Sequence, residues 1–130
     1  MKRVLVTGAR DWANIEVIRQ TLLKEQQNNP KKDYVLVHGN ARGADKMAAM
    51  VAMELCWEII AVPADWKKYG RAAGPIRNRQ MVEMNIDFCY AFHYDINSSK
   101  GTKDCLRQVA AKKIPGVLIG PKGEELERWR

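Results

Sequence analysis

At positions 34–45 the chain reads YVLVHGNARGAD, a short apolar run followed by a turn that lies between two glycines. A run such as Tyr34–Val37 is typical of a strand that is covered on both faces. After the turn, Met47, Val51 and Leu55 recur at helical spacing. The segment therefore predicts a buried strand that passes through a tight turn directly into a helix.

A turn of this kind has chemical consequences. The first N–H groups of a helix have no partner inside the helix, and the helix dipole favours negative charge at that end. Gly39 and Gly43 carry no Cβ, so a ligand can approach the main chain closely. Two interpretations remain open from this segment alone, a site for phosphate or another small anion, and a strand-to-helix turn without a ligand.

The alternation of strand and helix continues along the whole chain. Apolar runs predict five strands, at 4–6, 34–37, 58–62, 87–92 and 117–119. Helical spacing predicts helices between them, at about 15–28, 43–56, 74–84 and 102–113, with Thr102 as the cap of the last. Such an alternation implies one α/β domain of three layers over residues 1–120. We expect a mostly parallel, five-stranded sheet in the Rossmann-like order 3-2-1-4-5, with helices on both faces.

Two segments do not follow this alternation. The stretch at 64–73, ADWKKYGRAA, is polar and aromatic and shows no clear period, so we predict a long functional loop. The stretch at 121–130 is rich in charge. We predict that this C-terminal tail is either a short helix or disordered.

Composition limits the classes of function. The 130 residues carry a net charge of +7, which attracts nucleotides, phosphorylated metabolites or nucleic acid, although scattered surface lysines give the same value. Three widely spaced cysteines, Cys56, Cys89 and Cys105, favour a reduced, cytoplasmic setting over a disulfide framework or a zinc site. No apolar run has the length of a membrane span, so we expect no membrane association and no metal.

The predicted topology brings distant residues to one edge of the sheet. Ligands of open α/β sheets bind beyond the carboxyl ends of the strands, near the point where the strand order reverses. We therefore take as candidate ligand-binding residues those at the strand ends and helix starts of this edge: Thr7, Gly8, Arg10, His38, Gly39, Arg42, Gly43, Asp45, Asp65, Trp66, Arg77, Asn78, His93, Gly101 and Thr102.

Several of these residues allow two interpretations. The guanidinium of Arg77 suits a phosphate, but a first-turn arginine also occurs in a helix that faces solvent. Trp66 and Tyr69 either stack on a base or pack onto the domain as lid residues. His38 and His93 are suited to acid–base work near neutral pH, yet strand-end histidines are more often hydrogen-bonded structural residues.

Five short motifs carry a family resemblance, and they occur in this order: T-G-x-R at 7–10, H-G-x-A-x-G-A-D at 38–45, P-A-D-W at 63–66, G-P-x-R-N-x-x-M at 74–81 and G-T-x-D at 101–104. Together they resemble the small YpsA-related members of the SLOG superfamily, in the group of SMF/DprA and LOG proteins, over about residues 2–120. The resemblance implies a Rossmann-like domain that binds nucleotides or nucleotide-derived ligands at the strand-end edge. Some relatives are phosphoribohydrolases, others sense ADP-ribose-type signals, and others bind single-stranded DNA.

The resemblance also allows the hydrolase activity to be examined. Hydrolase members carry R-K-x-x-M on a helix and P-G-G-x-G-T-x-x-E at a turn. Here Asn78 stands in place of the lysine and Cys105 in place of the glutamate. An oxocarbenium-like transition state needs a placed carboxylate, so the loss of that glutamate argues against hydrolysis. If the chain is an enzyme, the candidates for catalysis are Arg77, Asp45 and Asp104.

We therefore expect a protein that binds a phosphorylated nucleotide or an ADP-ribose-like signalling ligand, as a sensor or a sequestering protein. Two alternatives remain, hydrolysis of the N-glycosidic bond of nucleoside 5′-monophosphates and binding of single-stranded nucleic acid. We expect no cofactor apart from such a nucleotide-like ligand. The superfamily often assembles, so a homo-oligomer is also expected.

Overall fold

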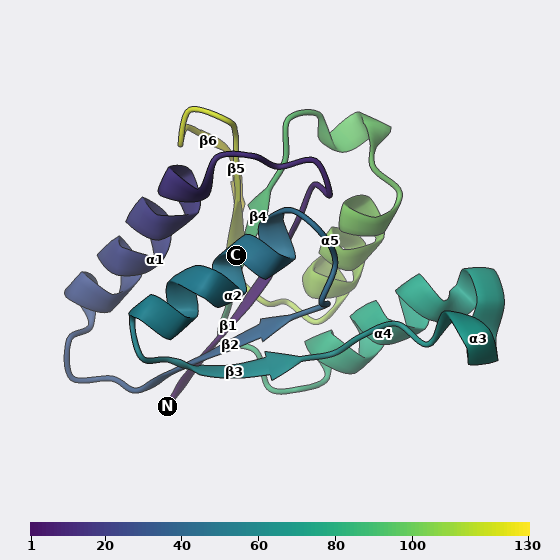
Figure 1. Ribbon diagram of the computed structural model, residues 1–130, viewed down its shortest axis with the longest axis horizontal. Coiled ribbons are helices and arrows are strands. Elements are labelled where there is room, and N and C mark those ends of the chain that lie inside the picture. Colours follow the sequence, from purple (N-terminus) through teal and green to yellow (C-terminus); the bar gives the residue numbers. More distant parts are fainter.

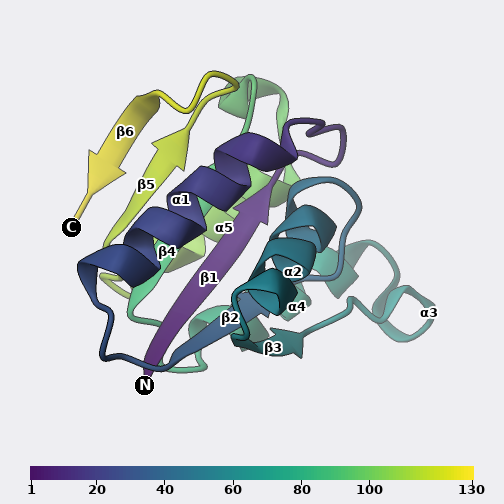
Figure 2. The same ribbon diagram turned by 60° about the vertical axis from the view of Figure 1, so that its left-hand side comes forward.

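The computed structural model describes residues 1–130 and is built around a six-stranded sheet of order β3-β2-β1-β4-β5-β6 (Figures 1 and 2). Five strands run parallel, whereas the sixth runs antiparallel to β5. The predicted α/β class and the order of the first five strands are confirmed. The strands are β1 (Lys2–Gly8), β2 (Tyr34–His38), β3 (Glu58–Ala61), β4 (Phe88–Phe92), β5 (Gly116–Ile119) and β6 (Glu125–Trp129).

Helices cover both faces of the sheet (Figure 2). One face carries α1 (Ile15–Asn28) and α2 (Ala44–Glu54), and the other carries α4 (Ala73–Val82) and α5 (Gly101–Ala111). Alternate residues of β1 divide between the two cores, because successive strand side chains point to opposite faces. Val4 and Val6 pack with the first helix pair and Leu5 with the second. No helix combines the length and apolar character needed to cross a membrane.

The C-terminal tail forms a strand, so both structures predicted for it were wrong. Strand β6 pairs with β5 after a turn in which Gly120 donates its N–H to the Glu124 carbonyl at 2.9 Å. The Trp129 ring lies against Gly116, and its indole N–H donates to the Ile114 carbonyl at 3.0 Å. The pattern hid this strand because β6 is an edge strand with charged side chains on both faces.

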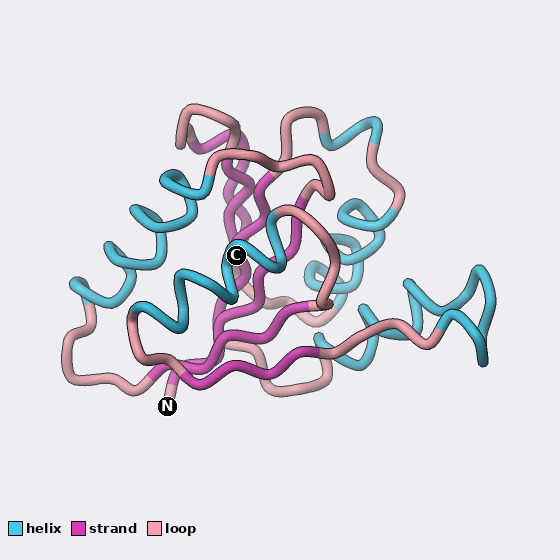
Figure 3. The backbone as a smooth tube through the Cα atoms, viewed as in Figure 1, coloured by secondary structure: helices cyan, strands magenta, loops and turns pink.

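The segment at 64–73 was predicted to be a loop and is helical from Trp66 onward. Helix α3 (Trp66–Tyr69) and the 3-10 turn η1 (Gly70–Ala72) lead directly into α4. Together they form an arm that extends beyond the sheet (Figure 3), and none of its residues is buried. Since no face of α3 is covered, its sequence shows no apolar period from which a helix could be predicted.

Helix α5 begins with a different cap from the one predicted. The Thr102 N–H donates to the Ser99 hydroxyl oxygen at 3.0 Å, so Ser99 caps the first turn and Thr102 lies inside the helix. The Thr102 side chain is buried. The turn before α5 lies at the same edge as the carboxyl ends of β1 and β4 (Figure 1).

Candidate functional site

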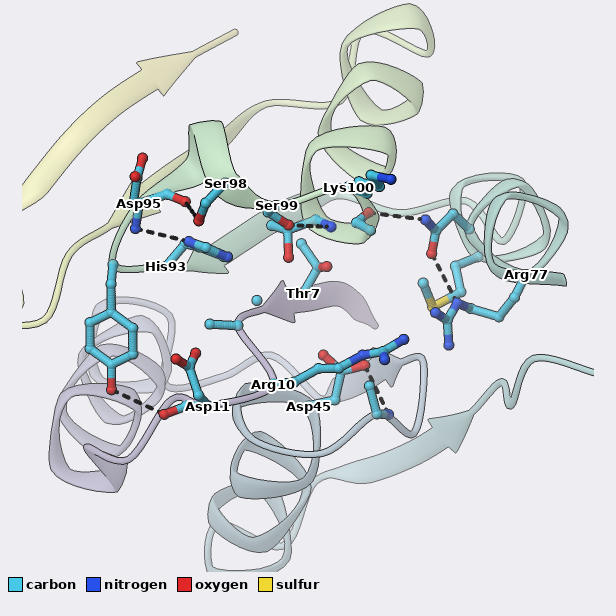
Figure 4. A pocket seen from close by; sticks show the side chains of 18 residues that line it. Thr7, Arg10, Asp11, Asp45, Arg77, His93, Asp95, Ser98, Ser99 and Lys100 are labelled. Carbon is cyan, nitrogen blue, oxygen red and sulfur yellow. Dashed lines mark hydrogen bonds between the residues drawn. The ribbon is translucent and has the colours of Figure 1, made fainter. Parts of the chain in front are cut away.

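A cavity of about 430 Å³ opens at the carboxyl ends of β1 and β4, where the strand order reverses (Figure 4). Parallel strands place such openings at their carboxyl ends because the connections to the following helices begin there. The walls come from the end of β1, the loop after β4, the middle of α4 and the start of α5. Arg77 was predicted in the first turn of its helix, but it lies further along because α4 already begins at Ala73. Among the candidate residues, those in the cavity lining are Thr7, Gly8, Arg10, Asp45, Arg77, Asn78, His93, Gly101 and Thr102.

A second cavity of about 600 Å³ adjoins the first. The two share three lining residues, Arg10, Ala41 and Arg77. The second is bounded in addition by the turn after β2 and by the segment that follows β3, and its further candidate residues are Gly39, Arg42 and Trp66. The structure thus divides the predicted edge into two adjoining hollows.

Three candidate residues line neither cavity. His38 is buried at the end of β2. Gly43 has a φ of 73°, and a Cβ there would overlap the carbonyl oxygens of Ala9 and Arg10. It therefore allows the loop after β1 to pack against the start of α2. Asp65 accepts the Lys68 N–H at 3.1 Å and so caps α3.

The amides of the turn after β2 were expected to be free for an anion, and several of them are not. The Gly39 and Ala41 N–H groups donate to the carboxylate of Asp45 at 2.9 and 3.4 Å. The Asn40 N–H donates to Nδ1 of His38 at 3.0 Å. An internal carboxylate therefore holds this turn. Burial of Asp45 raises the pKa of its carboxyl to about 6, although the two amides and Arg77 lower it.

Arg77 is fixed at the wall that both cavities share. Its Nη1 donates to the Gly39 carbonyl, and its Nε donates to Oδ1 of Asn78 at 2.9 Å. A Cβ at position 39 would overlap the guanidinium. Gly39 is thus required for the passage of Arg77, which is a different use from the close ligand approach expected from sequence.

Asn78 and Asp104 connect helices α4 and α5. The Asn78 Nδ2 donates to the Gly101 carbonyl at 3.3 Å and to the Asp104 carboxylate at 3.0 Å. The same carboxylate oxygen accepts from Gln108 at 2.9 Å. Asp104, one of the candidates for catalysis, therefore holds two helices together and lines neither cavity.

Both histidines make the same local hydrogen bond. Nδ1 of His38 accepts the N–H of Asn40 and Nδ1 of His93 accepts that of Asp95, each at 3.0 Å. Burial lowers the pKa of both imidazoles, most directly by disfavouring their charged forms. They are neutral at pH 7, and the structural interpretation describes them better than the acid–base one.

The turn before α5 contains main-chain N–H groups without a partner in the protein. Lys100 and Gly101 line the first cavity, and neither donates its N–H to another group of the protein. No atom lies within 4 Å of the place where a Gly101 Cβ would stand. The start of α5 is therefore open at its positive dipole end.

Charge is divided between two sides of the first cavity. Arg77 and Lys100 lie on one side in Figure 4, and Asp11 and Asp95 lie on the other. The candidate set omitted Lys100, Asp11, Tyr94, Asp95, Ser98 and Ser99, which all line the cavity. Asp11, Tyr94 and Asp95 lie within three residues of the ends of β1 and β4, so extending those strand ends would have found them. Ser98, Ser99 and Lys100 belong to the turn before α5, of which the candidate set took only Gly101 and Thr102.

The position that carries glutamate in the resembled hydrolases is filled by a buried thiol. Cys105 is fully buried, and burial raises its pKa to about 12. It is therefore a neutral core residue and cannot act as the expected carboxylate. No group of three or more His, Cys, Asp or Glu side chains lies together in a way that could hold a metal ion.

Three comparisons place the chain among known proteins. A solved structure of DNA processing protein A (DprA) from Streptococcus pneumoniae superimposes with a TM-score of 0.70 at 16% identity, over 92% of this chain and 50% of that one. The chain thus spans about half the length of that protein, and the likeness shows the fold. Gene 61 protein of Mycobacterium phage D29 is 37% identical in an alignment 127 residues long that covers 94% of this chain and 99% of the relative. Because the model of the family described as "YspA, cpYpsA-related SLOG family" matches residues 2–69, the chain belongs to that family.

Proposed function

We propose that the protein binds a phosphorylated nucleotide or a nucleotide-derived ligand, such as a nucleoside phosphate or an ADP-ribose derivative, in the cavity at the ends of β1 and β4. One observation carries this proposal. Arg10, Arg77 and Lys100 converge on the same cavity as the open first turn of α5. Membership of the SLOG family, which suggests a nucleotide-related ligand, supports the same ligand class.

We call the proposed phosphate-binding site, formed by Arg77, Lys100 and the first turn of α5, the phosphate seat. Guanidinium and ammonium groups donate charge-assisted hydrogen bonds to phosphate, and the first N–H groups of a helix add directed donors at a positive dipole end. Lys100 and Gly101 supply two such N–H groups. Arg77 is held in place by Gly39 and Asn78, so less side-chain entropy is lost when its remaining N–H groups bind an anion.

The residues of the site support binding of the nucleotide-type ligand without cleavage of its N-glycosidic bond. Asp104 is hydrogen-bonded to Asn78 and Gln108, and Asp45 holds the turn after β2. Cys105 offers a buried thiol where a glutamate would be needed. A site with strong anion donors and with these acids already engaged suits a protein that senses or sequesters its ligand.

Calorimetric titration of wild type, Lys100→Ala and Lys103→Ala with AMP and ADP-ribose tests the phosphate seat. Lys103 is the matched control, because it is exposed on the same helix and lines neither cavity. Loss of a charge-assisted contact is expected to weaken binding by about tenfold or more in Lys100→Ala, since such bonds contribute about 1.5–3 kcal/mol. Lys103→Ala is expected to bind as wild type does.

The outcomes separate the remaining functions. Absence of binding to both compounds, or equal losses in the two variants, would contradict the phosphate seat. Continuous release of free adenine, followed by chromatography, would show hydrolysis instead. Affinity for oligothymidylates that rises with their length and falls steeply with salt, without binding of mononucleotides, would favour a nucleic-acid binder.

A further inference from the structure

A third cavity, of about 330 Å³, lies between helix α1 and the hairpin of β5 and β6, on the side of the sheet away from α3 (Figure 2). It shares no lining residue with the two cavities at the carboxyl edge. Small-molecule sites have volumes of about 300–1,000 Å³, so this one has room for a small ligand. The proposed nucleotide site does not use this cavity.

The floor of the third cavity is apolar and partly aromatic. It is formed by Phe88 and Tyr90 of β4 and by Val117 and Ile119 of β5. The centroids of the two aromatic rings lie 4.8 Å apart, and both rings are only half-buried. Such a floor favours contact with an apolar group, because that contact removes apolar surface of both partners from water.

One wall carries a buried carboxylate, that of Glu25 on α1, which is 7% exposed. Its Oε2 accepts three hydrogen bonds, from Lys2 Nζ, the Tyr34 hydroxyl and Asn29 Nδ2, at 3.0, 2.8 and 3.1 Å. Its Oε1 accepts one, from the Tyr90 hydroxyl at 2.8 Å. Burial alone raises the pKa of Glu25, but these donors outweigh it and hold the pKa below its usual value. Glu25 is therefore ionised at pH 7, and Oε1 can accept one more hydrogen bond.

An unpaired cation belongs to the same wall. Lys24 lines the cavity and takes part in none of the ion pairs of the protein. The other two cations of the lining are paired, Lys2 with Glu25 and Arg128 with Glu125. The cavity therefore offers one free ammonium group and one carboxylate oxygen with a free acceptor position, together with an apolar floor.

We infer that the third cavity binds a free α-amino acid with an apolar side chain. The ligand carboxylate accepts from Lys24 Nζ, and the ligand ammonium donates to Glu25 Oε1. The ligand side chain lies on the floor formed by β4 and β5. A simple anion leaves the Glu25 oxygen unused, a simple cation leaves Lys24 unpaired, and a sugar makes no use of the floor. The site is independent of the proposed function.

An NMR titration of the whole protein, labelled in its methyl groups, tests this site. The methyl signals of Val117 and Ile119 report occupancy, because both side chains line the cavity. The probes are L-phenylalanine and L-leucine, with three compounds that each lack one feature. These are 3-phenylpropionate without the ammonium, 2-phenylethylamine without the carboxylate, and glycine without the side chain. Lys24→Gln removes the free cation. Lys103→Gln is the control, since Lys103 is exposed on α5 and lines none of the three cavities.

The better-bound of the two amino acids is expected to shift the Val117 and Ile119 signals and to bind at least tenfold more tightly than each of the three comparison compounds. Lys24→Gln should weaken that amino acid by about tenfold, because it removes a charge-assisted contact. The same change should leave the affinity for 2-phenylethylamine unaltered, since that compound has no carboxylate. Lys103→Gln should bind every probe as wild type does.

Three results would overturn the inference. In the first, neither amino acid moves the Val117 and Ile119 signals. In the second, 3-phenylpropionate binds as tightly as L-phenylalanine, which would mean that Glu25 takes no part and that the cavity prefers an apolar anion. In the third, Lys24→Gln and Lys103→Gln weaken binding equally, which would indicate a general effect of charge. None of these results bears on the phosphate seat, because the variants and probes that test it concern other residues.

Discussion

At the scale of single residues, Asp45 gives a pH-dependent signature. Burial raises the pKa of Asp45 in the folded protein to about 6, whereas the pKa of an unperturbed aspartate is 3.8. As pH rises from about 4 to 6, the unfolded chain loses the Asp45 proton first, so the carboxyl lowers the free energy of unfolding. A shift of this size corresponds to about 3 kcal/mol.

Replacing Asp45 by Asn removes that titration and keeps an oxygen for the Gly39 N–H. As pH rises from 4 to 7, the unfolding free energy of wild type is expected to fall by about 3 kcal/mol relative to that of Asp45→Asn. Urea unfolding at several pH values measures the difference. Asp33→Asn, at an exposed aspartate, is the control. Parallel pH curves for wild type and Asp45→Asn would show that Asp45 is not the buried acid described.

The sequence pointed to the right residues of this turn for reasons that were partly wrong. Gly39 and Gly43 mark a tight turn, and a turn is present. Gly39 makes room for Arg77, which lies 38 positions away in the sequence, and Gly43 makes room for Ala9, which lies 34 positions away. The Asp45 carboxylate accepts the Gly39 and Ala41 N–H groups only because of the rotamer that its side chain adopts. A single sequence shows neither kind of contact, because both are set by the packing of separate elements.

At the scale of elements, predictability followed burial. Strands β1 and β2 and helix α5 each bury one or two faces, so their apolar spacing was visible in the sequence. Helix α3 and strand β6 bury almost nothing, and neither was predicted. Elements without a buried face carry no hydrophobic period, and only their tertiary neighbours define them.

Besides its pairing with β5, strand β6 is anchored through the Trp129 side chain, which makes a specific prediction. Trp129→Ala removes the ring from Gly116 and the hydrogen bond to Ile114, and is expected to cost about 2 kcal/mol of unfolding free energy. Leu126→Ala, on the same strand but 52% exposed, should change stability by less than about 0.5 kcal/mol. Denaturant unfolding compares them. Equal effects would mean that β6 is not anchored through Trp129.

At the scale of the whole molecule, the sheet order explains why the site could be located in advance. A reversal between β1 and β4 fixes one crevice at the carboxyl edge, whatever the loops contain. The division of that crevice into two cavities could not be predicted, because it depends on the side-chain conformations of residues such as Arg10 and Arg77, which line both. The homo-oligomer stays a prediction.

The central claim is that the open turn before α5 receives the phosphate of a nucleotide-type ligand. An amide-resolved NMR titration of the ¹⁵N-labelled protein with ADP-ribose tests it most directly. The account predicts that the largest shifts fall on the Lys100 and Gly101 amides, with smaller ones at Gly39 and Ala41, whose N–H groups Asp45 already holds. Saturation with ADP-ribose that leaves Lys100 and Gly101 unmoved, or a spectrum that does not change at all, would contradict it.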